Sequence, residues 1–331
     1  MKVLVDDRWF GETGIGRYAR EILQRKPERH SVACLNRGWR ISNPVTPWLL
    51  GAAANRGGAD LFWSPGFMPP ALCRIPYVVT VHDLIHLHYG SARHRFYYDQ
   101  VIRRLLSGAA SVLTVSEHSR EEILEWSGLE ADRVRAVPLA ASPAFSAGTE
   151  RFEPGYPYIL YVGNRRVYKN LHRLIRAFAA GCRDTGIRLA LSGDPDRDLL
   201  DLIGRLGLGE RVVFLGRIAE EALPAVYRGA LALAYVSLYE GFGLPPLEAM
   251  ACGTPVLASN VTSLPEVVGD AGLLVDPLDV EEIAHGLSRL TEDGALRSEL
   301  VRRGQERVRR RFNWEVCATS TWEVLRQAAQ A

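Results

Sequence analysis

The sequence of 331 residues has little lysine, little cysteine and no long apolar run, and its charges nearly cancel. Its 40 lysines and arginines are matched by 38 acidic residues, and the net charge of +2 argues against nucleic acid as the main partner. Lysine itself occurs only at positions 2, 26 and 169. Lys169 therefore stands out among basic residues that are almost all arginine.

The five cysteines are odd in number and scattered, and none forms a C-x-x-C pair. This pattern indicates reduced, mostly buried thiols in a cytosolic protein. No apolar run approaches the roughly 20 residues that a membrane-spanning helix needs. The N-terminus runs directly into a predicted strand, with no sign of a signal peptide. We expect a soluble, cytoplasmic protein.

The composition, with 47% apolar residues, is that of a globular protein, and the length suggests two domains. Short apolar runs alternate with helical patterns, which predicts an α/β fold with parallel sheets. Residues 37–58 fit neither pattern and are expected to be irregular. The expected strands are 3–5, 30–35, 59–63, 77–81, 111–115, 134–137, 158–162, 188–192, 212–216, 231–236, 256–258 and 273–275.

The most informative stretch, residues 237–253, follows the apolar run 231–236. Two glycines let the backbone turn sharply, and Pro245 suits the first turn of a helix. Gly253 is placed as the left-handed cap after the end of that helix. Glu240 then lies on the loop and Glu248 in the first turns of the helix. Both are at the carboxyl end of a strand, where open α/β sheets bind ligands.

This geometry suits a nucleotide-sugar. A helix N-terminus offers free N–H groups and a positive dipole end to a diphosphate. The two prolines lack an N–H, so Gly243, Leu244 and Leu247 are expected to supply most of these donors. Glu248 can accept both hydroxyls of a ribose, and Glu240 can hold the sugar. The alternative is an ordinary βα unit, which the surrounding glycines, prolines and cap make the weaker interpretation.

The stretch resembles the paired-glutamate signature of the family-4 retaining glycosyltransferases, here Glu240-Gly-Phe-Gly-Leu-Pro-Pro-Leu-Glu248-Ala-Met-Ala-Cys-Gly-Thr-Pro-Val. The likeness extends in order over nearly the whole chain. It implies the GT-B fold, an α/β architecture of two Rossmann-like domains that face each other across a cleft. It also implies donor contacts from the loop residues Gly241, Phe242, Gly243 and Leu244.

A second strand-to-helix turn, residues 163–170, carries three cations that suit a diphosphate. Arginine provides a bidentate fork and lysine a point charge. In the resembling family, cations of this turn lie on the donor phosphates, although Asn164 stands where many members have arginine. We therefore assign catalysis to Arg166 and Lys169, and donor binding to Arg165. Solvated surface charges are the alternative, and the side chain of Lys169 is expected to be exposed.

In the first half of the chain, His82 follows the apolar strand 77–81. A lone histidine is usually structural, but a place at the carboxyl end of a strand favours a ligand-facing role. The resemblance implies that His82 contacts the transferred sugar near its reactive carbon.

Gly14-x-Gly16-x-x-Ala19 formally matches a dinucleotide fingerprint, but it does not follow its strand directly. We expect Gly14 and Gly16 in a mobile loop, which the resemblance places beside the donor phosphates and the acceptor. A plain surface turn is the alternative.

Two other patterns invite a functional interpretation. Asp194, Asp196 and Asp198 form two D-x-D triplets that could hold Mg²⁺ or Mn²⁺. We expect instead that Asp198 caps the following helix, as Ser119-x-x-Glu122 is expected to cap another, and that no metal is bound. Residues 91–107 predict a basic helix with aromatics. It could rest on anionic lipid, but a core-packed helix with a solvated basic face is favoured.

The stretch 138–157 is rich in Pro, Ala, Ser and Gly and is expected to hold the interdomain linker. The predicted domains are 1–145 on the acceptor side and 146–310 for the nucleotide-sugar. A helix at 311–331 crosses back to the first domain, as in the resembling family.

The predicted function is retaining, metal-independent and cofactor-free transfer of a sugar from a nucleotide-diphosphate sugar to an acceptor hydroxyl. The product would be a polysaccharide, lipid-linked glycan or glycoconjugate. A nucleotide-sugar epimerase and a non-catalytic nucleotide-sugar-binding protein are the alternatives.

Overall fold

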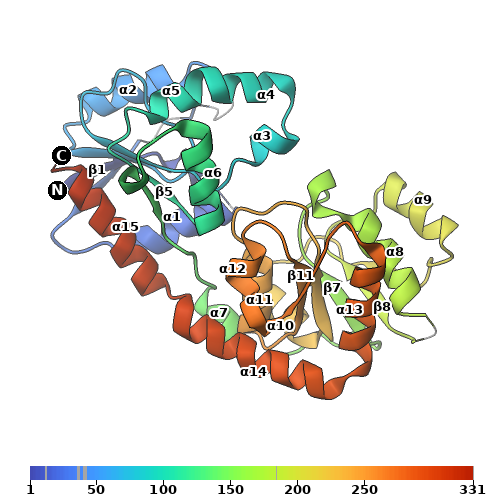
Figure 1. Cartoon of the computed structure of the whole chain (residues 1–331). Coiled ribbons are helices and arrows are strands. Elements are labelled where there is room, and N and C mark those ends of the chain that lie inside the picture. The colour runs from blue at the N-terminus through green and yellow to red at the C-terminus, as the bar shows by residue number, and fades with distance from the viewer. Residues whose placement is uncertain (12, 36–37, 40–42, 184, 331) are drawn as a thin grey trace. The chain divides into compact units, whose positions relative to one another are not determined.

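The computed structural model describes residues 1–11, 13–35, 38–39, 43–183 and 185–330, and the chain divides into two compact units (Figure 1). Unit 1 comprises Met1–Leu139 together with Trp314–Ala331, and unit 2 comprises Ala140–Asn313. The predicted boundaries, after residues 145 and 310, fall a few residues from these. Each unit is built on one sheet and is described here by itself.

The sheet of unit 1 has six parallel strands in the order β2-β1-β3-β4-β5-β6. The short apolar runs of the sequence form these strands, and β3, β4 and β5 are buried along their whole length. The direction of strand order reverses between β1 and β3, a type of place where α/β sheets bind ligands. The strands are β1 (Lys2–Val5), β2 (Ser31–Cys34), β3 (Leu61–Ser64), β4 (Tyr77–Thr80), β5 (Ser111–Thr114) and β6 (Val134–Ala136).

Helices cover both faces of this sheet, with α2 and α5 on one side and α1 and α15 on the other (Figure 1). Although α15 follows unit 2 in the sequence, it packs on α1, β3, β4 and β5. Its Trp322 donates a 3.0 Å hydrogen bond to the carbonyl of Ile22 and stacks on His30. The helices are α1 (Gly14–Gln24), α2 (Thr46–Arg56), α3 (Ile85–Tyr89), α4 (Ala92–Tyr97), a π-helical turn (Tyr98–Ile102), α5 (Arg103–Leu106), α6 (Glu117–Ser127) and α15 (Trp314–Ala328).

Two expectations for unit 1 are wrong. Residues 46–56, expected to be irregular, form α2, while residues 37 and 40–42 of the same stretch lie outside the described residues. The cap of α6 is Ser116, whose hydroxyl accepts a hydrogen bond from the N–H of Ser119 at 3.1 Å. Glu122 pairs with His88 instead of closing a capping box. Helix α6 therefore begins one turn earlier than the sequence pattern indicated.

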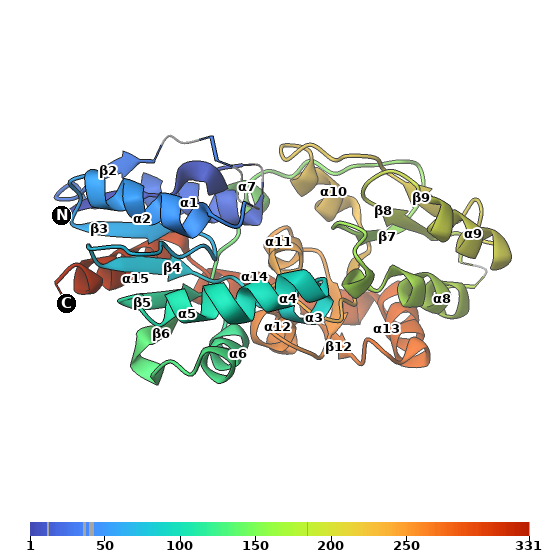
Figure 2. The same ribbon diagram turned by 90° about the horizontal axis from the view of Figure 1, so that it is seen from above.

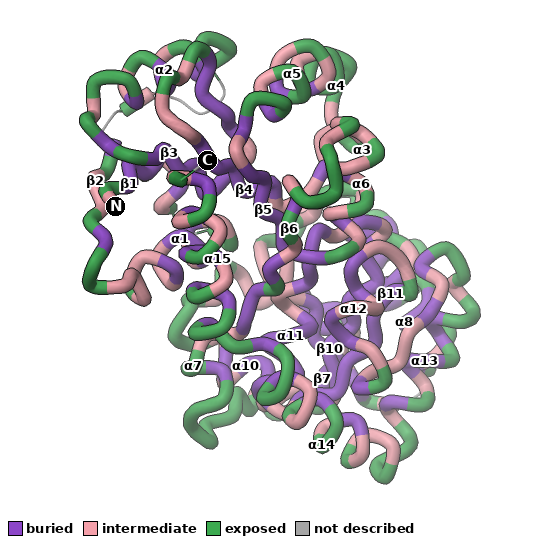
Figure 3. The backbone as a smooth tube through the Cα atoms, turned by 60° about the vertical axis from the view of Figure 1, so that its left-hand side comes forward, coloured by how far each residue is buried: buried purple, intermediate pink, exposed green. Residues whose placement is uncertain are grey.

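Unit 2 has a second parallel sheet of six strands, in the order β12-β11-β10-β7-β8-β9. Its strand order reverses between β7 and β10. The central strands are buried throughout, as the tube in Figure 3 shows. The strands are β7 (Tyr158–Tyr161), β8 (Arg188–Leu191), β9 (Val212–Phe214), β10 (Ala232–Tyr235), β11 (Val256–Ser259) and β12 (Leu273–Val275).

The helices of unit 2 pack on each other through small residues and apolar faces. α8 packs closely on α13, where a Cβ on Gly181 would lie only 2.2 Å from the carbonyl oxygen of Ala284. α11 packs on α10, α12 and α14, and Figure 2 gives a second view of these elements. The helices are α7 (Pro143–Ser146), α8 (Leu171–Gly181), α9 (Arg197–Arg205), α10 (Leu223–Gly229), α11 (Leu244–Ala251), α12 (Leu264–Val268), α13 (Val280–Glu292) and α14 (Gly294–Arg311).

The cap of α9 corrects another prediction. Asp196, not Asp198, is the N-cap, and its carboxylate accepts from the N–H of Leu199 at 3.0 Å. Asp198 lies in the first turn and pairs with His172 at 2.7 Å. Within the described ranges, no helix is long and apolar enough to cross a membrane.

Candidate active site

The site predicted in unit 2 lies where the strand order reverses. The cationic turn follows β7, and the paired-glutamate stretch follows β10, the strand hydrogen-bonded beside it. The carboxyl ends of parallel neighbours meet at one edge of the sheet, so the two segments come together. A hydrogen bond of 2.7 Å from the N–H of Leu238 to the carbonyl of Tyr168 joins them directly.

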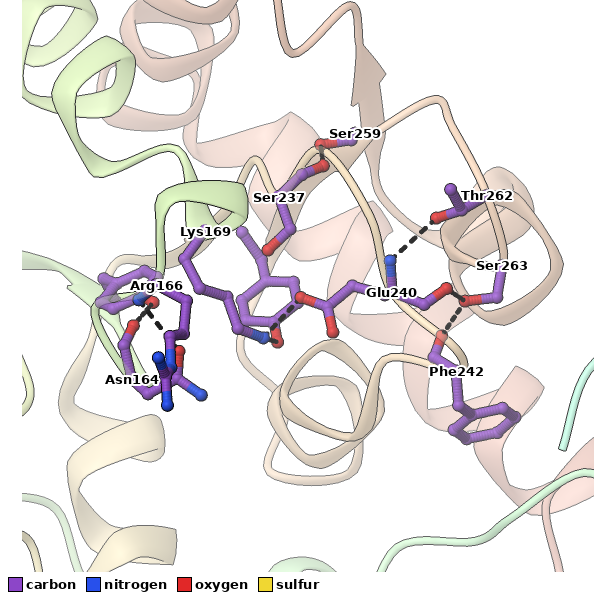
Figure 4. A network of polar contacts seen from close by, with 12 residues as sticks. Asn164, Arg166, Lys169, Ser237, Glu240, Phe242, Ser259, Thr262 and Ser263 are labelled. Carbon is purple, nitrogen blue, oxygen red and sulfur yellow. Dashed lines mark hydrogen bonds and ion pairs between the residues drawn. The ribbon is translucent and has the colours of Figure 1, made fainter. Parts of the chain in front are cut away.

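Lys169 and Glu240 form the centre of this site (Figure 4). The ammonium Nζ of Lys169 lies 2.6 Å from Oε1 of Glu240 and donates a 2.8 Å hydrogen bond to the hydroxyl of Tyr235. The side chains of Lys169 and Glu240 are only 8% and 12% exposed. The expectation of an exposed Lys169 is therefore wrong, because this side chain is buried in an ion pair.

The loop that carries Glu240 is held by hydroxyl groups of the next strand-to-helix turn. The N–H of Glu240 donates to Oγ1 of Thr262 at 3.2 Å. The hydroxyl of Ser263 lies 2.9 Å from the carbonyl oxygen of Glu240 and 2.8 Å from that of Phe242. Ser259 donates to the carbonyl of Ser237 at 2.6 Å. These contacts, drawn in Figure 4, fix the backbone on both sides of the Glu240 carboxylate.

The start of α11 matches the sequence prediction in outline. Gly243 is the N-cap with a φ of 114°, a conformation that favours glycine, and prolines occupy the first turn. Gly253 ends the segment with a φ of 74°. The N–H of Leu247 bonds to the carbonyl of Gly243 at 3.3 Å, so Leu247 is not the free donor that we expected. Donors toward a phosphate must then come from Gly243 and Leu244.

Glu248 and Phe242, both predicted to bind the donor, are buried. Glu248 is 4% exposed, and its Oε2 accepts a 3.1 Å hydrogen bond from the hydroxyl of Tyr227. The ring of Phe242 packs edge-on against Phe312, with ring centroids 5.9 Å apart. Phe242 therefore contributes its backbone and its packing to the loop rather than an exposed ring.

The two arginines of the cationic turn have different surroundings. Arg165 donates to the carbonyl of Ser192 at 3.0 Å, lies 3.4 Å from Asp196, and covers the ring of Phe214. Arg166 is exposed, and its N–H is held by Oδ1 of Asn164 at 3.1 Å. Arg166 thus presents its guanidinium to solvent at the edge of the sheet, whereas Arg165 ties this turn to the loop after β8.

Two of the three aspartates of the D-x-D triplets make contacts within the fold. Asp196 caps α9 and contacts Arg165, and Asp198 pairs with His172. No group of three or more His, Cys, Asp or Glu side chains that could hold a metal ion is found in the described part of the chain.

His82 lies at the carboxyl end of β4 in unit 1, as predicted. Its Nε2 is 2.9 Å from the carbonyl oxygen of Pro65, and its ring contacts Tyr18 edge-on at 5.1 Å. Burial of the ring lowers the pKa of His82 to about 4, so the side chain is neutral near pH 7. A neutral imidazole bonded to a carbonyl donates through Nε2–H, which leaves Nδ1 as an acceptor.

Gly14 and Gly16 correct the expectation of a mobile loop. They form the first turn of α1, where the Thr13 hydroxyl caps the N–H of Gly16 at 3.2 Å. A Cβ on Gly16 would lie 1.9 Å from the carbonyl oxygen of Gly11, so this glycine permits a close backbone approach. Glu12, within the same stretch, lies outside the described residues.

Both halves of the chain match known glycosyltransferase families. Residues 146–307 match the family described as glycosyl transferases group 1, and residues 15–140 match the glycosyl transferase 4-like domain. The O-antigen chain mannosyltransferase B of Escherichia coli is 36% identical over 279 residues, which cover 79% of this chain and 72% of that protein. This chain is a family-4 glycosyltransferase.

Further relatives agree with this assignment. The MMP alpha-(1->4)-mannosyltransferase of Mycolicibacterium hassiacum is 30% identical over 285 residues, covering 80% of this chain and 68% of that protein. Among solved structures, Anabaena HepE in complex with UDP-glucose superposes with a TM-score of 0.80 at 20% identity, over 99% of this chain and 100% of that chain. The glycosyltransferase therefore has the GT-B fold.

Sequence reasoning missed the residues that support the site. Tyr235 contacts Lys169 directly, and Thr262 and Ser263 hold the Glu240 loop. The available signal was weak, since Tyr235 is one apolar residue in a buried strand. Its place as the last residue of β10, beside the glutamate loop, could have singled it out.

Proposed function

We propose that this glycosyltransferase is a retaining, metal-independent enzyme that moves a mannosyl group from a nucleoside-diphosphate sugar to an acceptor hydroxyl during glycan biosynthesis. One observation carries the proposal most strongly. The buried Lys169–Glu240 pair, with the exposed Arg166 beside it, places cations and a carboxylate where the strand order of unit 2 reverses. The cations can bind the negatively charged oxygens of a diphosphate, and the carboxylate can accept hydrogen bonds from sugar hydroxyls.

The ammonium of Lys169 has three N–H donors, and Glu240 and Tyr235 occupy two of them. The third can bind a diphosphate oxygen. As the bond from the sugar C1 to the phosphate oxygen breaks, its electron pair goes to the leaving diphosphate. Lys169, Arg166 and the backbone donors of Gly243 and Leu244 stabilise that charge. Glu248 accepts hydrogen bonds from the ribose hydroxyls.

The acceptor hydroxyl attacks C1 from the face that the diphosphate leaves, and its proton passes to the departing phosphate oxygen. This route explains why the proposal includes no covalent nucleophile and neither a metal nor another cofactor. His82, being neutral, can accept a hydrogen bond from a hydroxyl of the transferred sugar without adding charge. Gly14, Gly16 and Arg165 are proposed to contact the donor. Within unit 1, Gly16 allows a close backbone approach, and within unit 2, Arg165 holds the cationic turn against the loop after β8.

The sugar is proposed from the relatives, since the two mannosyltransferases named above are 36% and 30% identical to this chain. A thermal-shift screen with GDP-mannose, UDP-glucose, UDP-galactose and UDP-N-acetylglucosamine tests it, because a bound donor raises the apparent stability. We expect GDP-mannose to give the largest shift. A larger shift with a UDP-sugar would overturn the choice of mannose.

The test of the catalytic proposal is Lys169→Ala, assayed for turnover of GDP-mannose. A group that neutralises charge on the leaving diphosphate stabilises the transition state more than the ground state. We expect kcat to fall by roughly 10²-fold and to fall more than KM rises. Lys169→Arg should rescue only part of the loss, because a planar fork does not replace a compact ammonium. A Lys169→Ala enzyme with normal kcat would refute the role.

The epimerase alternative binds the same kind of donor but releases no nucleotide to an acceptor. GDP released only when acceptor is added identifies a transferase. An epimer formed without acceptor identifies an epimerase, and GDP-mannose binding with neither reaction identifies a sugar-binding protein.

We further propose that the enzyme works on the cytoplasmic side of a membrane and rests on anionic lipid through residues 91–106. Residues 91–96 are all exposed, and Phe96 is 68% exposed. The acidic residue of this segment, Asp99, accepts a hydrogen bond from Trp126. The hydroxyl of Tyr97 donates a hydrogen bond to the carbonyl of Pro44, a few residues before Trp48, which is 47% exposed. Basic side chains around exposed aromatics suit an anionic interface.

Co-sedimentation with vesicles tests the membrane proposal. We expect binding to phosphatidylglycerol-containing vesicles and little binding to pure phosphatidylcholine. Arg93→Gln with Arg95→Gln should reduce the partition coefficient at least about tenfold, at roughly 1 kcal/mol for each charge. Arg309→Gln with Arg310→Gln, two exposed arginines on α14 of unit 2, is the matched control. Equal losses in the two variants would contradict a specific membrane face.

A further inference from the structure

Two buried tyrosines lie under the cationic turn and the Glu240 loop. Tyr161 is the last residue of β7 and Tyr235 the last residue of β10, and these strands are hydrogen-bonded neighbours. Tyr161 is 0% exposed and Tyr235 is 1% exposed. Their rings stack with centroids 6.3 Å apart and planes within 18° of parallel. Two hydroxyl groups are thus buried side by side at the reversal point of the sheet.

The hydroxyl of Tyr235 accepts the 2.8 Å hydrogen bond from Lys169, and the ammonium lies 5.0 Å from the centre of the Tyr235 ring. Burial, the charge of Glu240 and a hydrogen bond to Glu240 raise the pKa of Tyr235 well above its ordinary value. Tyr235 is therefore a neutral phenol near pH 7. It fixes the direction of the ammonium without neutralising its charge.

The hydroxyl of Tyr161 holds the turn that carries Arg166. It donates a 2.6 Å hydrogen bond to the carbonyl of Asn164, whose side-chain oxygen accepts the N–H of Arg166. A Cβ on Gly163 would lie 2.8 Å from this hydroxyl, so glycine is required where the chain passes over the phenol. The stacked pair therefore connects to both of the cations proposed to face the diphosphate.

We propose that Tyr161 and Tyr235 are positioning residues that set the two diphosphate-facing cations, Tyr235 by binding the ammonium of Lys169 and Tyr161 by holding the backbone of the Arg166 turn. The inference rests on the proposed function, because it assumes that Lys169 and Arg166 face the diphosphate. Without the phenol of Tyr235, the ammonium loses one of its two fixed partners and leans toward Glu240. The third N–H of the Lys169 ammonium, which is proposed to bind the diphosphate, is then no longer held in one direction.

Phenylalanine substitutions test this, because each keeps the ring and removes only the hydroxyl. Using GDP-mannose as donor, we expect Tyr235→Phe to lower kcat by about tenfold while the donor KM changes less than about twofold. Tyr161→Phe should raise the dissociation constant of GDP by about threefold to tenfold, measured by calorimetry. Such a split between kcat and binding is not expected from a general loss of stability.

Tyr158→Phe is the matched control. Tyr158 is the first residue of the same strand β7, is 1% exposed, and donates a 2.6 Å hydrogen bond to the carbonyl of Val226. Tyr158→Phe removes a comparable buried hydrogen bond, but this bond involves neither Lys169 nor the turn that carries Arg166. We expect kcat and GDP affinity within about twofold of the parent. If Tyr235→Phe and Tyr161→Phe behave like Tyr158→Phe, the positioning roles are refuted.

A double-mutant cycle separates this inference from the proposed function. If Tyr235 acts through Lys169, Tyr235→Phe should cost less than about twofold in kcat once Lys169→Met is present. A further loss of about tenfold in that background would overturn the inference. A Lys169→Met enzyme with normal kcat would instead remove the proposed function itself. In a third outcome, Lys169→Met lowers kcat but Tyr235→Phe has the same kcat as Tyr158→Phe. That result overturns the positioning role and leaves the proposed function standing.

Discussion

Replacing Lys169 by methionine should destabilise unit 2 as well as slow the reaction. The substitution keeps the length and apolar body of the side chain but leaves the carboxylate of Glu240, 12% exposed, without its 2.6 Å partner. Removing one member of a buried ion pair costs about 3–5 kcal/mol. We expect the lower end, about 3 kcal/mol, because the hydroxyl of Tyr235 still hydrogen-bonds to Glu240.

For a unit of this size, about 3 kcal/mol corresponds to a fall in the melting temperature of about 6–12 °C. Differential scanning calorimetry of the whole chain measures it. The double substitution Lys169→Met with Glu240→Gln removes both charges, and should lie within about 1 kcal/mol of the parent. This recovery distinguishes an uncompensated charge from a simple loss of packing.

The control is Arg310→Met on α14, which breaks an exposed pair with Glu306 at 2.7 Å. Exposed pairs of this kind contribute about 0.3–0.5 kcal/mol. If Lys169→Met lowers the melting temperature no more than Arg310→Met, or if the double substitution is simply additive, the burial argument is wrong.

Three further outcomes are expected. Glu248→Ala should weaken GDP binding by about 1.5–3 kcal/mol in calorimetry, and unchanged affinity in a folded variant would refute the ribose role. Activity should survive EDTA, and Asp194→Ala with Asp196→Ala should keep turnover at a stability cost of about 1 kcal/mol for the lost cap; Mn²⁺-dependent rescue would revive the D-x-D hypothesis. The pKa of His82 falls from 6.5 in the unfolded chain to about 4 in the folded protein. Between these two values the unfolded chain binds more protons than the folded protein, so the free energy of unfolding falls as the pH falls. In urea unfolding His82 should contribute about 2 kcal/mol to the loss between pH 7 and pH 5, and His82→Gln should remove that part. Burial also lowers the pKa of His30, which adds a loss of the same sign that remains in the variant.

The sheets could be predicted because their signal is local. Runs such as Tyr77–Thr80 and Tyr158–Tyr161 are apolar and bounded by turn residues, and each forms the expected buried strand. The paired-glutamate stretch was equally clear, since glycine and proline mark the turn into α11 and its first residues. Helix α2 was missed because its apolar residues, such as Trp48 and Leu50, lie among alanines without a clear periodicity.

The site could be predicted only in part, because its partners are distant in the sequence. The burial of Lys169 depends on Tyr235 and Glu240, which lie 66 and 71 residues further on. No property of the local sequence distinguishes a lysine in such a pair from one in solvent. The prediction of the N-cap of α9 was wrong for a local reason. Asp196 and Asp198 are equally good capping residues, and the choice between them depends on where the first turn of the helix begins.

The place of α15 has a consequence for synthesis of the protein on the ribosome. Its Trp314–Ala328 helix covers β3, β4 and β5 of unit 1, but it is translated only after all of unit 2. Domains commonly fold as they emerge, N-terminal first. Here the nascent unit 1 lacks the helix that covers β3, β4 and β5 while unit 2, whose residues are contiguous, emerges and can fold. A released chain that ends at residue 313 should therefore have a protease-resistant unit 2 and a protease-sensitive unit 1.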